Sequence, residues 1–205
     1  MNNFGVKHAN GEYILLLNND TEVITPNWIE NMLEHAQREE IGAVGVQLLY
    51  PNDTIQHAGV ILGINGGKGR GVAGHAFKYF PAEVQGFPVL KDVIRNYSAV
   101  TAACLMIRKD KFSSVKGLNK EFRIAFNDVD FCLKLAEKGF NNLYTPYAKL
   151  YHHESISVGT PEKGTRDIRE FEKEIDLMWK RWEKEITNDP FYNRNLSLSS
   201  EDFSI

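Results

Sequence analysis

The hydrophobic pattern of the chain is clearest near its start, where the apolar run Tyr13–Leu17 continues without a break. Gly11 lies before this run, and the polar residues Asn18, Asn19 and Asp20 follow it. A short apolar run with polar boundaries is typical of a strand that is buried on both faces of a parallel sheet. Ligands of such sheets bind at the carboxyl ends of the strands. The three polar side chains are therefore candidates for metal or phosphate binding, and the alternative is that they only turn the chain out of the sheet.

Helical and extended patterns alternate along the next part of the chain. Thr25 and Pro26 predict the start of a helix, with Thr25 as the N-cap and Pro26 as the first helical residue. The apolar run Ile41–Leu49 predicts a second strand, so that strand, helix and strand form a β-α-β unit. Thr54–Leu62 predicts one further strand. The apolar face of the predicted helix consists of Trp28, Ile29, Met32, Leu33 and Ala36.

The second half of the chain has the same mixed character. Tyr97–Ile107 is a second buried element of small and apolar residues, and Asn127–Lys138 is a helix that Asn127 can cap and Gly139 ends. Thr165–Lys184 predicts a long charged helix whose one apolar side packs across the outside of the core. Shorter elements are a helix over Lys109–Val115 and strands over Asn141–Tyr144 and Ala148–Tyr151. The pattern as a whole predicts an α/β fold.

The segment Gly63–Gly74 contains six glycines, with Lys68 and Arg70 among them. A Gly-rich loop with two cations can cradle a phosphate group. The spacing of the glycines is neither that of a P-loop nor that of a dinucleotide-binding loop, and no clear helix follows it. A mobile flap is an alternative to phosphate binding, and a plain hairpin loop is favoured over both.

Length and composition limit the classes of protein that need to be considered. The 205 residues fit one sizeable domain, which we divide into a core over residues 1–160 and a C-terminal helix and tail over residues 161–205 that pack on it. A net charge of -3 gives no global electrostatic reason to expect binding to nucleic acid. Cys104 and Cys132 lie in apolar surroundings, which indicates reduced core cysteines. Because no spanning helix or signal peptide is visible, we expect a cytoplasmic protein.

Polar clusters follow predicted strands or begin predicted helices at three places. They are Asn19-Asp20, Asn127-Asp128 with Asp130, and His152-His153. A hard divalent ion that holds a diphosphate would take carboxylate and imidazole ligands at such places. Each cluster also has a structural explanation, since acidic residues favour the positive end of a helix and polar residues favour turns. The residues alone leave both explanations open, and the order of the clusters along the chain favours a binding site.

This order resembles that of the inverting glycosyltransferases of family 2, which have the nucleotide-diphospho-sugar transferase (GT-A) fold, a mixed sheet flanked by helices. Ala9–Glu22 resembles the strand that leads into the DXD-type metal motif of the family, with Asn18 at the first acidic place and Asp20 at the last. Phe126–Lys134 resembles the Glu-Asp motif, in which Asn127 replaces the usual glutamate and Asp128 is retained.

The resemblance covers nearly all of the chain. Tyr151–Ser155 resembles the histidine motif that follows the last core strand of the family, and Thr101–Ile107 and Lys116–Glu121 resemble its acceptor side. The ending Asp189–Ser197 resembles the tail of rhamnosyltransferase-like members that build bacterial surface polysaccharide. The resemblance therefore implies a transferase that moves a sugar from a nucleotide-diphospho-sugar donor to a glycan or lipid-linked acceptor, at the inner face of the membrane.

The resemblance also implies roles for the polar clusters. Asp128 would remove the proton of the acceptor hydroxyl as a general base, and Asn127 would bind the acceptor or orient the base. Asp20, with Asn18 and Asn19 beside it, would face the diphosphate of the donor. Asp20 and His152 would hold Mg²⁺ or Mn²⁺, and His152 is preferred over His153 as the ligand.

One departure from the family concerns the start of the chain. Family members place a βαβ half that binds the nucleotide base and ribose before the metal strand, whereas the similarity here begins near Asn3. We therefore expect a GT-A fold that lacks this half, and weak binding of nucleotide sugars by the chain alone. Two interpretations follow, an enzyme and a non-catalytic remnant or interaction subunit. A sheet without these strands would expose an edge that can pair with a partner or a second copy of the chain.

Overall fold

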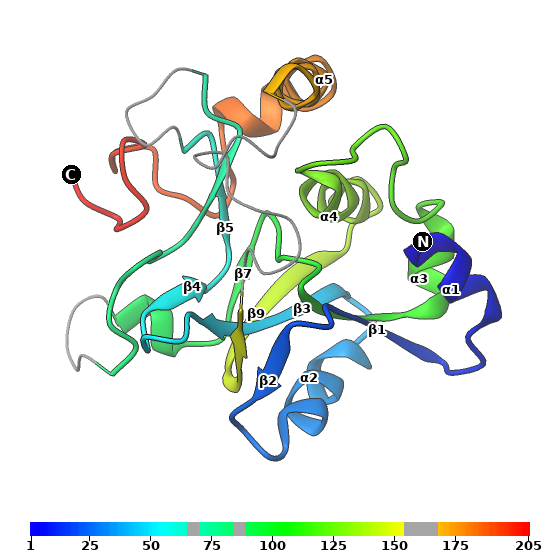
Figure 1. Ribbon diagram of the computed structural model, residues 1–205. Coiled ribbons are helices and arrows are strands. Elements are labelled where there is room, and N and C mark those ends of the chain that lie inside the picture. Colours follow the sequence, from blue (N-terminus) through cyan, green and yellow to red (C-terminus); the bar gives the residue numbers. More distant parts are fainter. Residues whose placement is uncertain (65–69, 84–88, 154–167) are drawn as a thin grey trace.

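A mixed β-sheet forms the centre of the molecule (Figure 1), whose computed structural model describes residues 1–64, 70–83, 89–153 and 168–205. The main path of the sheet runs in the order β1 (Tyr13–Leu17), β8 (Cys104–Arg108), β3 (Ile41–Leu49), β9 (Asn141–His152) and β2 (Thr21–Val23). β4 (Ile55–His57) pairs with β3, and β7 (Arg95–Tyr97) pairs with β9. β5 (Val60–Leu62) and β6 (Ala73–His75) form a separate antiparallel pair.

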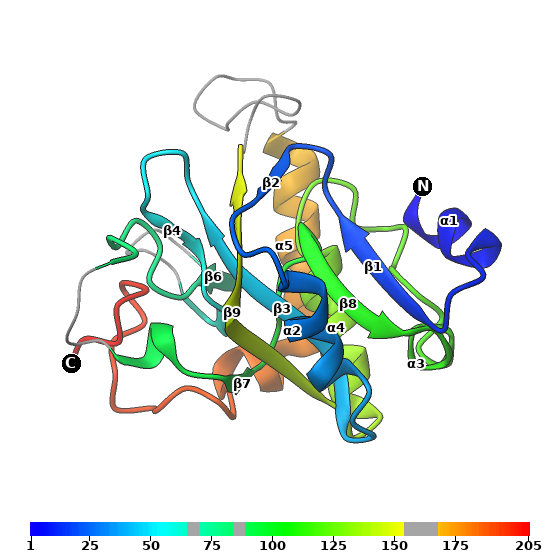
Figure 2. The same cartoon turned by 90° about the horizontal axis from the view of Figure 1, so that it is seen from below.

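Helices cover both faces of this sheet. They are α1 (Asn2–His8), α2 (Trp28–Ala36), α3 (Lys109–Ser114), α4 (Asn127–Glu137) and α5 (Ile168–Thr187), with a short 3-10 helix over Val89–Asp92. Figures 1 and 2 show α2 on one face and α4 and α5 on the other. The predicted α/β fold with a mixed sheet and flanking helices is confirmed. In the described ranges, no helix combines the length and the apolar character that crossing a bilayer requires.

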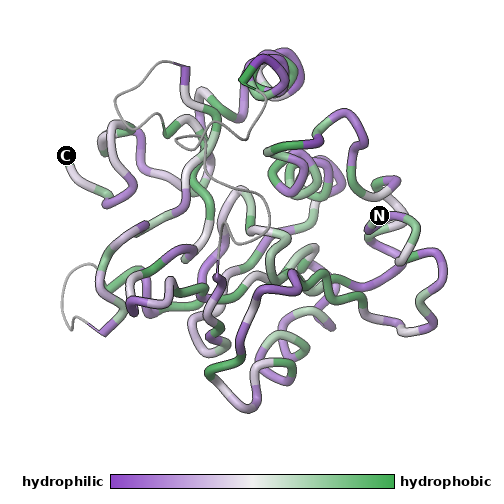
Figure 3. Tube along the Cα trace, viewed as in Figure 1, coloured by the Kyte–Doolittle hydropathy of each residue, from purple (hydrophilic) through white to green (hydrophobic). Residues whose placement is uncertain are grey.

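Two hydrophobic cores fill the spaces between the helices and the sheet. On the α2 side, Trp28 and Met32 pack with residues of β3 and β9 such as Val44 and Leu150. The larger core lies on the α4 and α5 side. α5 contributes Met178 and Trp182 to it, although most of the helix surface is hydrophilic (Figure 3). Within the described residues, the predicted charged helix spans Ile168–Thr187, and Met178 and Trp182 are buried against the core, whereas Ile168 is exposed.

Every residue of the central strand β3 is buried, whereas β1 is not buried on both faces. In β1 only Ile14 and Leu16 are buried, whereas Leu17 is exposed. The predicted strand Tyr13–Leu17 is therefore confirmed, but the prediction that it is buried on both faces is wrong. The burial differs because β1 lies at the end of the strand order and pairs only with β8 within the described part of the chain. β8 runs antiparallel to both β1 and β3, so β1 and β3 are parallel but are not neighbours.

Several predicted boundaries change because of contacts between distant parts of the chain. α2 begins at Trp28, since Thr25 Oγ1 accepts a hydrogen bond from the N–H of Lys149 (3.1 Å) instead of capping the helix. β9 is one strand instead of two, because it pairs with β3 along nearly its whole length. α4 begins at Asn127 itself, and its N-cap is Phe126 in the left-handed region (φ 59°).

The predicted strand Thr54–Leu62 is two strands, because the chain turns at Gly59 with φ 104°. β5 and β6 on either side of the glycine-rich segment form an antiparallel pair, as expected for the hairpin interpretation. Residues 65–69 of the Gly63–Gly74 segment, including Lys68, lie outside the described residues. The phosphate and flap alternatives therefore stay untested. Both cysteines are free and buried, as predicted.

Candidate functional site

The carboxyl ends of β1 and β9 meet at one edge of the sheet. β9 is parallel to β3, and β1 has the same direction because β8 is antiparallel to both β1 and β3. The turn after β1 leads into β2, whose first residue Thr21 pairs with His152 at the end of β9. The N–H of His153 also donates to the carbonyl oxygen of Asp20 (2.9 Å). Two clusters that lie about 130 residues apart in sequence are thereby joined.

His152 is the histidine that faces the turn after β1. Its Nε2 lies 3.1 Å from Oδ1 of Asp20 and 3.1 Å from Nδ2 of Asn18. The His152 side chain is 11% exposed and that of Asp20 17%. His153 points elsewhere, with its Nε2 3.3 Å from Oε2 of Glu22 and a more exposed side chain. The geometry thus groups Asn18 and Asp20 with His152, and leaves Asn19 exposed on the turn.

Gln56 on β4 holds the imidazole of His152 through two hydrogen bonds. Gln56 Nε2 donates to the main-chain oxygen of His152 (3.2 Å), so Gln56 Oε1 is left to accept from His152 Nδ1 at 2.6 Å. A neutral His152 ring therefore carries its proton on Nδ1 and a lone pair on Nε2. Sequence analysis missed Gln56. Its only signal is a long polar side chain inside the otherwise apolar pattern of Thr54–Leu62.

Asp20 and His152 fit a divalent cation. Within the described residues, Oδ1 of Asp20 is buried without a hydrogen-bond partner, and it lies 3.1 Å from His152 Nε2, which also contacts Nδ2 of Asn18. Two acceptors that face each other repel unless a proton or a metal ion lies between them. Their separation of 3.1 Å is close to the spacing of about 3.0 Å between adjacent ligands of an octahedral ion with ligand distances of about 2.1 Å.

These two side chains would leave other coordination positions for oxygen atoms of a ligand or water. Within the ranges that the structure describes, no three His, Cys, Asp or Glu side chains gather at one point. Mg²⁺ and Mn²⁺ sites that bind substrate phosphates often use only one or two protein carboxylates. The residues present therefore match a shared protein–substrate metal site better than a fully protein-enclosed one.

Asp128 lies in the first turn of α4, where its carboxylate is held by main-chain donors. Oδ2 accepts from the N–H of Ala102 (3.1 Å) and Oδ1 accepts from the N–H of Val129 (2.9 Å). These bonds fix the orientation of the carboxylate at the N-terminus of α4. Asn127 precedes it and also lines the cavity described below. Among the described residues, the Asn127 amide makes no hydrogen bond.

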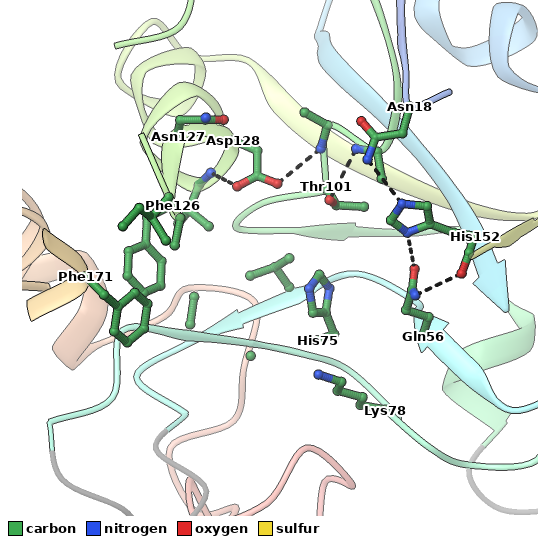
Figure 4. Close-up of a pocket in the computed structure, with 18 of the residues that line it drawn as sticks. Asn18, Gln56, His75, Lys78, Thr101, Phe126, Asn127, Asp128, His152 and Phe171 are labelled. Carbon is green, nitrogen blue, oxygen red and sulfur yellow. Dashed lines mark hydrogen bonds between the residues drawn. The ribbon is translucent and has the colours of Figure 1, made fainter. Parts of the chain in front are cut away.

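The short segment Thr101–Ala103 joins the two halves of the site. The carbonyl oxygen of Ala103 accepts from the N–H of Asn18 (2.9 Å), while the N–H of Ala102 donates to Asp128 (3.1 Å). Thr101 Oγ1 accepts from the N–H of Ala103 (3.3 Å) and so stabilises the bend of the segment. Figure 4 shows Asp128 and His152 on either side of this segment. One short stretch of main chain therefore sets their relative positions.

A cavity of about 560 Å³ opens in front of these groups. Asn18, Asn127, Asp128 and His152 line it, whereas Asn19 and Asp20 do not. Its other walls include residues of the 101–103 segment, of β4, of β6 and the chain after it, and of the contact between α4 and α5. They include Gln56, His75, Lys78, Thr101, Phe126 and Phe171 (Figure 4). The rings of Phe126 and Phe171 stack with their centroids 5.6 Å apart.

His57 lies beneath the cavity and is fully buried. Burial lowers the pKa of His57 well below its ordinary value, and the neighbouring His75 and His152 lower it further. His57 Nδ1 lies 2.8 Å from His75 Nδ1, so one of the two nitrogens donates to the other. Burial thus keeps His57 neutral, and its contact with His75 places it next to the cavity lining.

Asp130 is not part of the cavity, although the sequence places it beside Asp128. Its carboxylate is fully buried and accepts from Trp182 Nε1 (3.0 Å). Arg181 and Lys134 lie within 3.2 Å and 3.3 Å of its two oxygens. Asp130 therefore joins α4 to α5, which is a structural role.

Comparison with known proteins places these features in a family context. The family model described as glycosyl transferase family 2 matches residues 2–114. The uncharacterized protein y4gI of Sinorhizobium fredii is 46% identical over 99% of this chain and 22% of its own length. The O-antigen biosynthesis protein RfbC of Myxococcus xanthus is 36% identical over 98% of this chain and 15% of its own length. The chain thus spans about a fifth or less of the length of these curated relatives.

Two further similarities are more distant. An N-acetylglucosaminyl-diphospho-decaprenol L-rhamnosyltransferase of Mycobacterium tuberculosis is 30% identical over 60 residues, which is 29% of this chain and 20% of that protein. The crystal structure of GalNAc-T7 with UDP, GalNAc and Mn²⁺ superposes with a TM-score of 0.62 at 14% sequence identity. The match covers 94% of this chain and 37% of that one. At this identity the likeness concerns the fold alone.

Proposed function

Because the chain belongs to glycosyl transferase family 2, we propose that its cavity transfers a sugar from a nucleotide-diphospho-sugar donor to a glycan or lipid-linked acceptor, with inversion. The GT-A fold expected from the sequence is confirmed by the likeness to the GalNAc-T7 structure. One observation carries the proposal. Asp128 and His152 line the same cavity, and Asp20 lies 3.1 Å from His152, so that the proposed base and one of the two proposed metal ligands face one space.

Inverting transfer is a single displacement, in which the acceptor oxygen attacks the anomeric carbon as the diphosphate leaves. Asp128 takes the proton of the attacking hydroxyl in this proposal, which makes the oxygen a better nucleophile. The N–H groups of Ala102 and Val129 hold its carboxylate in place. Since positioning determines how well a general base works, these bonds support the assignment of Asp128. Asn127 binds the acceptor beside the base, because its amide lines the cavity.

The donor diphosphate is proposed to lie at the turn after β1. Asp20 and His152 would hold Mg²⁺ or Mn²⁺, and a bound ion neutralises the charge that develops on the leaving diphosphate. The GalNAc-T7 structure contains UDP and Mn²⁺, which supports the use of a divalent ion in this fold. Asn18 and Asn19 complete the turn, and Asn18 lines the cavity. Gln56 keeps the His152 lone pair directed at the site of the ion.

Surface polysaccharide synthesis is the proposed setting. The printed names of two relatives, an O-antigen biosynthesis protein and a rhamnosyltransferase, support it. We propose that the protein works at the cytoplasmic face of the membrane, with residues 1–160 as the catalytic core and residues 161–205 as a helix and tail that complete it. A deoxyhexose such as rhamnose is the first donor sugar to test.

A donor-hydrolysis and transfer assay tests the proposal. The natural polypeptide that carries this chain would be incubated with a panel of nucleotide sugars, with Mn²⁺, Mg²⁺ or chelator. We expect release of nucleoside diphosphate that depends on the divalent ion, and a product whose anomeric configuration, read by NMR, is opposite to that of the donor. Retention of configuration would overturn the inverting mechanism. Turnover that is unaffected by chelator would overturn the role of the metal.

The second interpretation, a non-catalytic interaction subunit, has one supporting observation. β1 pairs only with β8 within the described residues, and its last residue Leu17 is exposed. An unpaired strand edge can accept a strand from a partner or a second copy. Light scattering coupled to gel filtration shows whether the chain by itself is a monomer or a dimer. A stable dimer that Leu15→Pro abolishes would support pairing through β1, since proline removes a main-chain donor.

A further inference from the structure

Glu174 on α5 accepts hydrogen bonds from three consecutive main-chain N–H groups. Its Oε1 accepts from Arg123 (2.6 Å) and Ile124 (2.9 Å), and its Oε2 accepts from Ala125 (2.7 Å). The side chain is buried, with 2% of the residue exposed. Burying a carboxylate costs free energy unless hydrogen-bond donors satisfy its oxygens, and the three N–H groups supply those donors here.

The loop that Glu174 holds leads directly into the helix of Asp128. Phe126 follows Ala125 with φ 59°, a conformation that is strained for a non-glycine residue. Phe126 is also the N-cap residue of α4, and its side chain makes no capping hydrogen bond. The start of α4 therefore lacks the local interaction that usually fixes a helix N-terminus. Its position depends on contacts from elsewhere in the chain.

α5 supplies those contacts at two further points. Phe171, one turn before Glu174, stacks on the ring of Phe126. Trp182 donates to Asp130, which lies one turn into α4. Hydrogen bonds and ring contacts from one helix thus hold the loop, the N-cap and the first turn of α4. Figure 4 shows the stacked rings of Phe126 and Phe171. Asp128 lies between these points.

We propose that Glu174 is a positioning residue for Asp128, which sets the place of the general base through the main chain of residues 123–126. The inference rests on the proposed role of Asp128. It extends the functional site to α5, because the C-terminal helix then determines the geometry of the reaction instead of only covering the core. Without the carboxylate, the loop would relax, Phe126 would leave its strained conformation, and the bond from Ala102 to Asp128 would lengthen.

Glu174→Gln tests this with minimal change in shape. The amide keeps an acceptor for part of the loop but turns an NH₂ group toward at least one N–H donor. We expect faster hydrogen exchange at the amides of residues 123–125 and, through Asp128, at Ala102, by about tenfold. Glu172→Gln is the matched control, since Glu172 is exposed on the same helix. Faster exchange at residues 123–125 with unchanged exchange at Ala102 would overturn the proposal, and this readout needs no turnover.

Kinetics give an independent readout. Glu174→Gln should lower kcat by about 10- to 100-fold with little change in the KM of the donor, whereas Glu172→Gln should change neither. In a double-mutant cycle, Glu174→Gln should add no further loss to Asp128→Asn, because it acts through that side chain. An equal loss in both backgrounds contradicts the inference. Full turnover of Asp128→Asn alone would instead refute the proposed function, so the two failures are distinguishable.

Discussion

Gln56 and His152 bind each other through both the side chain and the main chain of the histidine. The Gln56 amide donates to the His152 carbonyl oxygen (3.2 Å) and accepts from its Nδ1 (2.6 Å). This double contact determines which ring nitrogen of a neutral His152 carries the proton, because the carbonyl oxygen can only accept. The other nitrogen, Nε2, lies beside both Asp20 and Asn18.

Replacement of Gln56 should therefore weaken metal binding without removing a ligand. Gln56→Leu removes the amide and leaves Nδ1 of His152 without its acceptor, so we expect Mn²⁺ affinity to fall by about 10- to 100-fold. Titration of Mn²⁺ followed by electron paramagnetic resonance measures this directly. Gln37→Leu, at an exposed position after α2, serves as the control. Equal Mn²⁺ affinities for the Gln56 variant and the parent would exclude His152 as a ligand oriented by Gln56.

Measurements of turnover and of Mn²⁺ affinity should distinguish the role of Asp128 from that of Asp20. Asp128→Asn should reduce kcat by about 10²- to 10⁴-fold, because the amide cannot take the proton of the acceptor hydroxyl. Mn²⁺ and donor affinities should stay close to those of the parent. Asp20→Asn should instead lower Mn²⁺ affinity, since a carboxylate ligand becomes a neutral one. Asp176→Asn on the exposed side of α5 is a charge-matched control. Turnover that is retained in the Asp128→Asn variant would show that Asp128 is not the general base.

The stability of the protein should decrease as the solution becomes acidic, in part because of His57. Burial lowers the pKa of His57 well below the ordinary value of 6.5, so the folded protein keeps the ring neutral. The unfolded chain takes up a proton as the pH falls below that value. The unfolded state then binds more protons, and the free energy of unfolding falls by at most about 1.4 kcal/mol per pH unit for this group. Above the ordinary value the contribution is constant.

Urea unfolding at about pH 7, 6 and 5 measures this slope. His57→Asn should flatten the dependence, while His8→Asn, at an exposed position in α1, should leave it unchanged. The slope should decrease but not vanish, because burial also lowers the pKa of His35. A His57 variant with the same slope as the parent would show that His57 is protonated in the folded state.

The sequence was sufficient for the parts of the site that depend on strand order. A polar cluster at the end of an apolar run can be recognised locally, and parallel strands bring such ends to one edge of the sheet. For this reason Asn18, Asp20 and His152 could be expected near one another, and the family resemblance added Asp128. The fold class followed from the same alternation of strands and helices.

Residues that act through long-range pairing could not be found in this way. Gln56 reaches His152 because β4 pairs with β3, and that pairing has no local signal. Glu174 is one acidic residue among many on a charged helix, and only its burial against residues 123–125 distinguishes it. The exposure of β1 was missed because an apolar run looks alike at the centre and at the edge of a sheet. The left-handed Phe126 was unforeseeable, since phenylalanine rarely adopts that conformation.

Gly59 offers a test of how strongly the backbone beneath the site is constrained. It lies between β4 and β5 with φ 104°, and a Cβ atom there would overlap the ring of the fully buried Tyr97. Gly59→Ala combines backbone strain with overpacking, so we expect it to lower the free energy of unfolding by about 2–4 kcal/mol. Gly5→Ala is the contrasting variant, because a Cβ at Gly5 would have no neighbour within 4 Å and alanine favours a helix.

Urea denaturation of the two variants should therefore give opposite results. Gly5→Ala should leave stability unchanged or raise it by up to about 1 kcal/mol. Since Gly59 follows Gln56 by three residues, its replacement should also disturb the support of His152 and lower Mn²⁺ affinity in the protein that stays folded. A Gly59→Ala protein with parental stability would mean that the turn between β4 and β5 tolerates a side chain. The orientation of Gln56 would then depend on strand pairing alone.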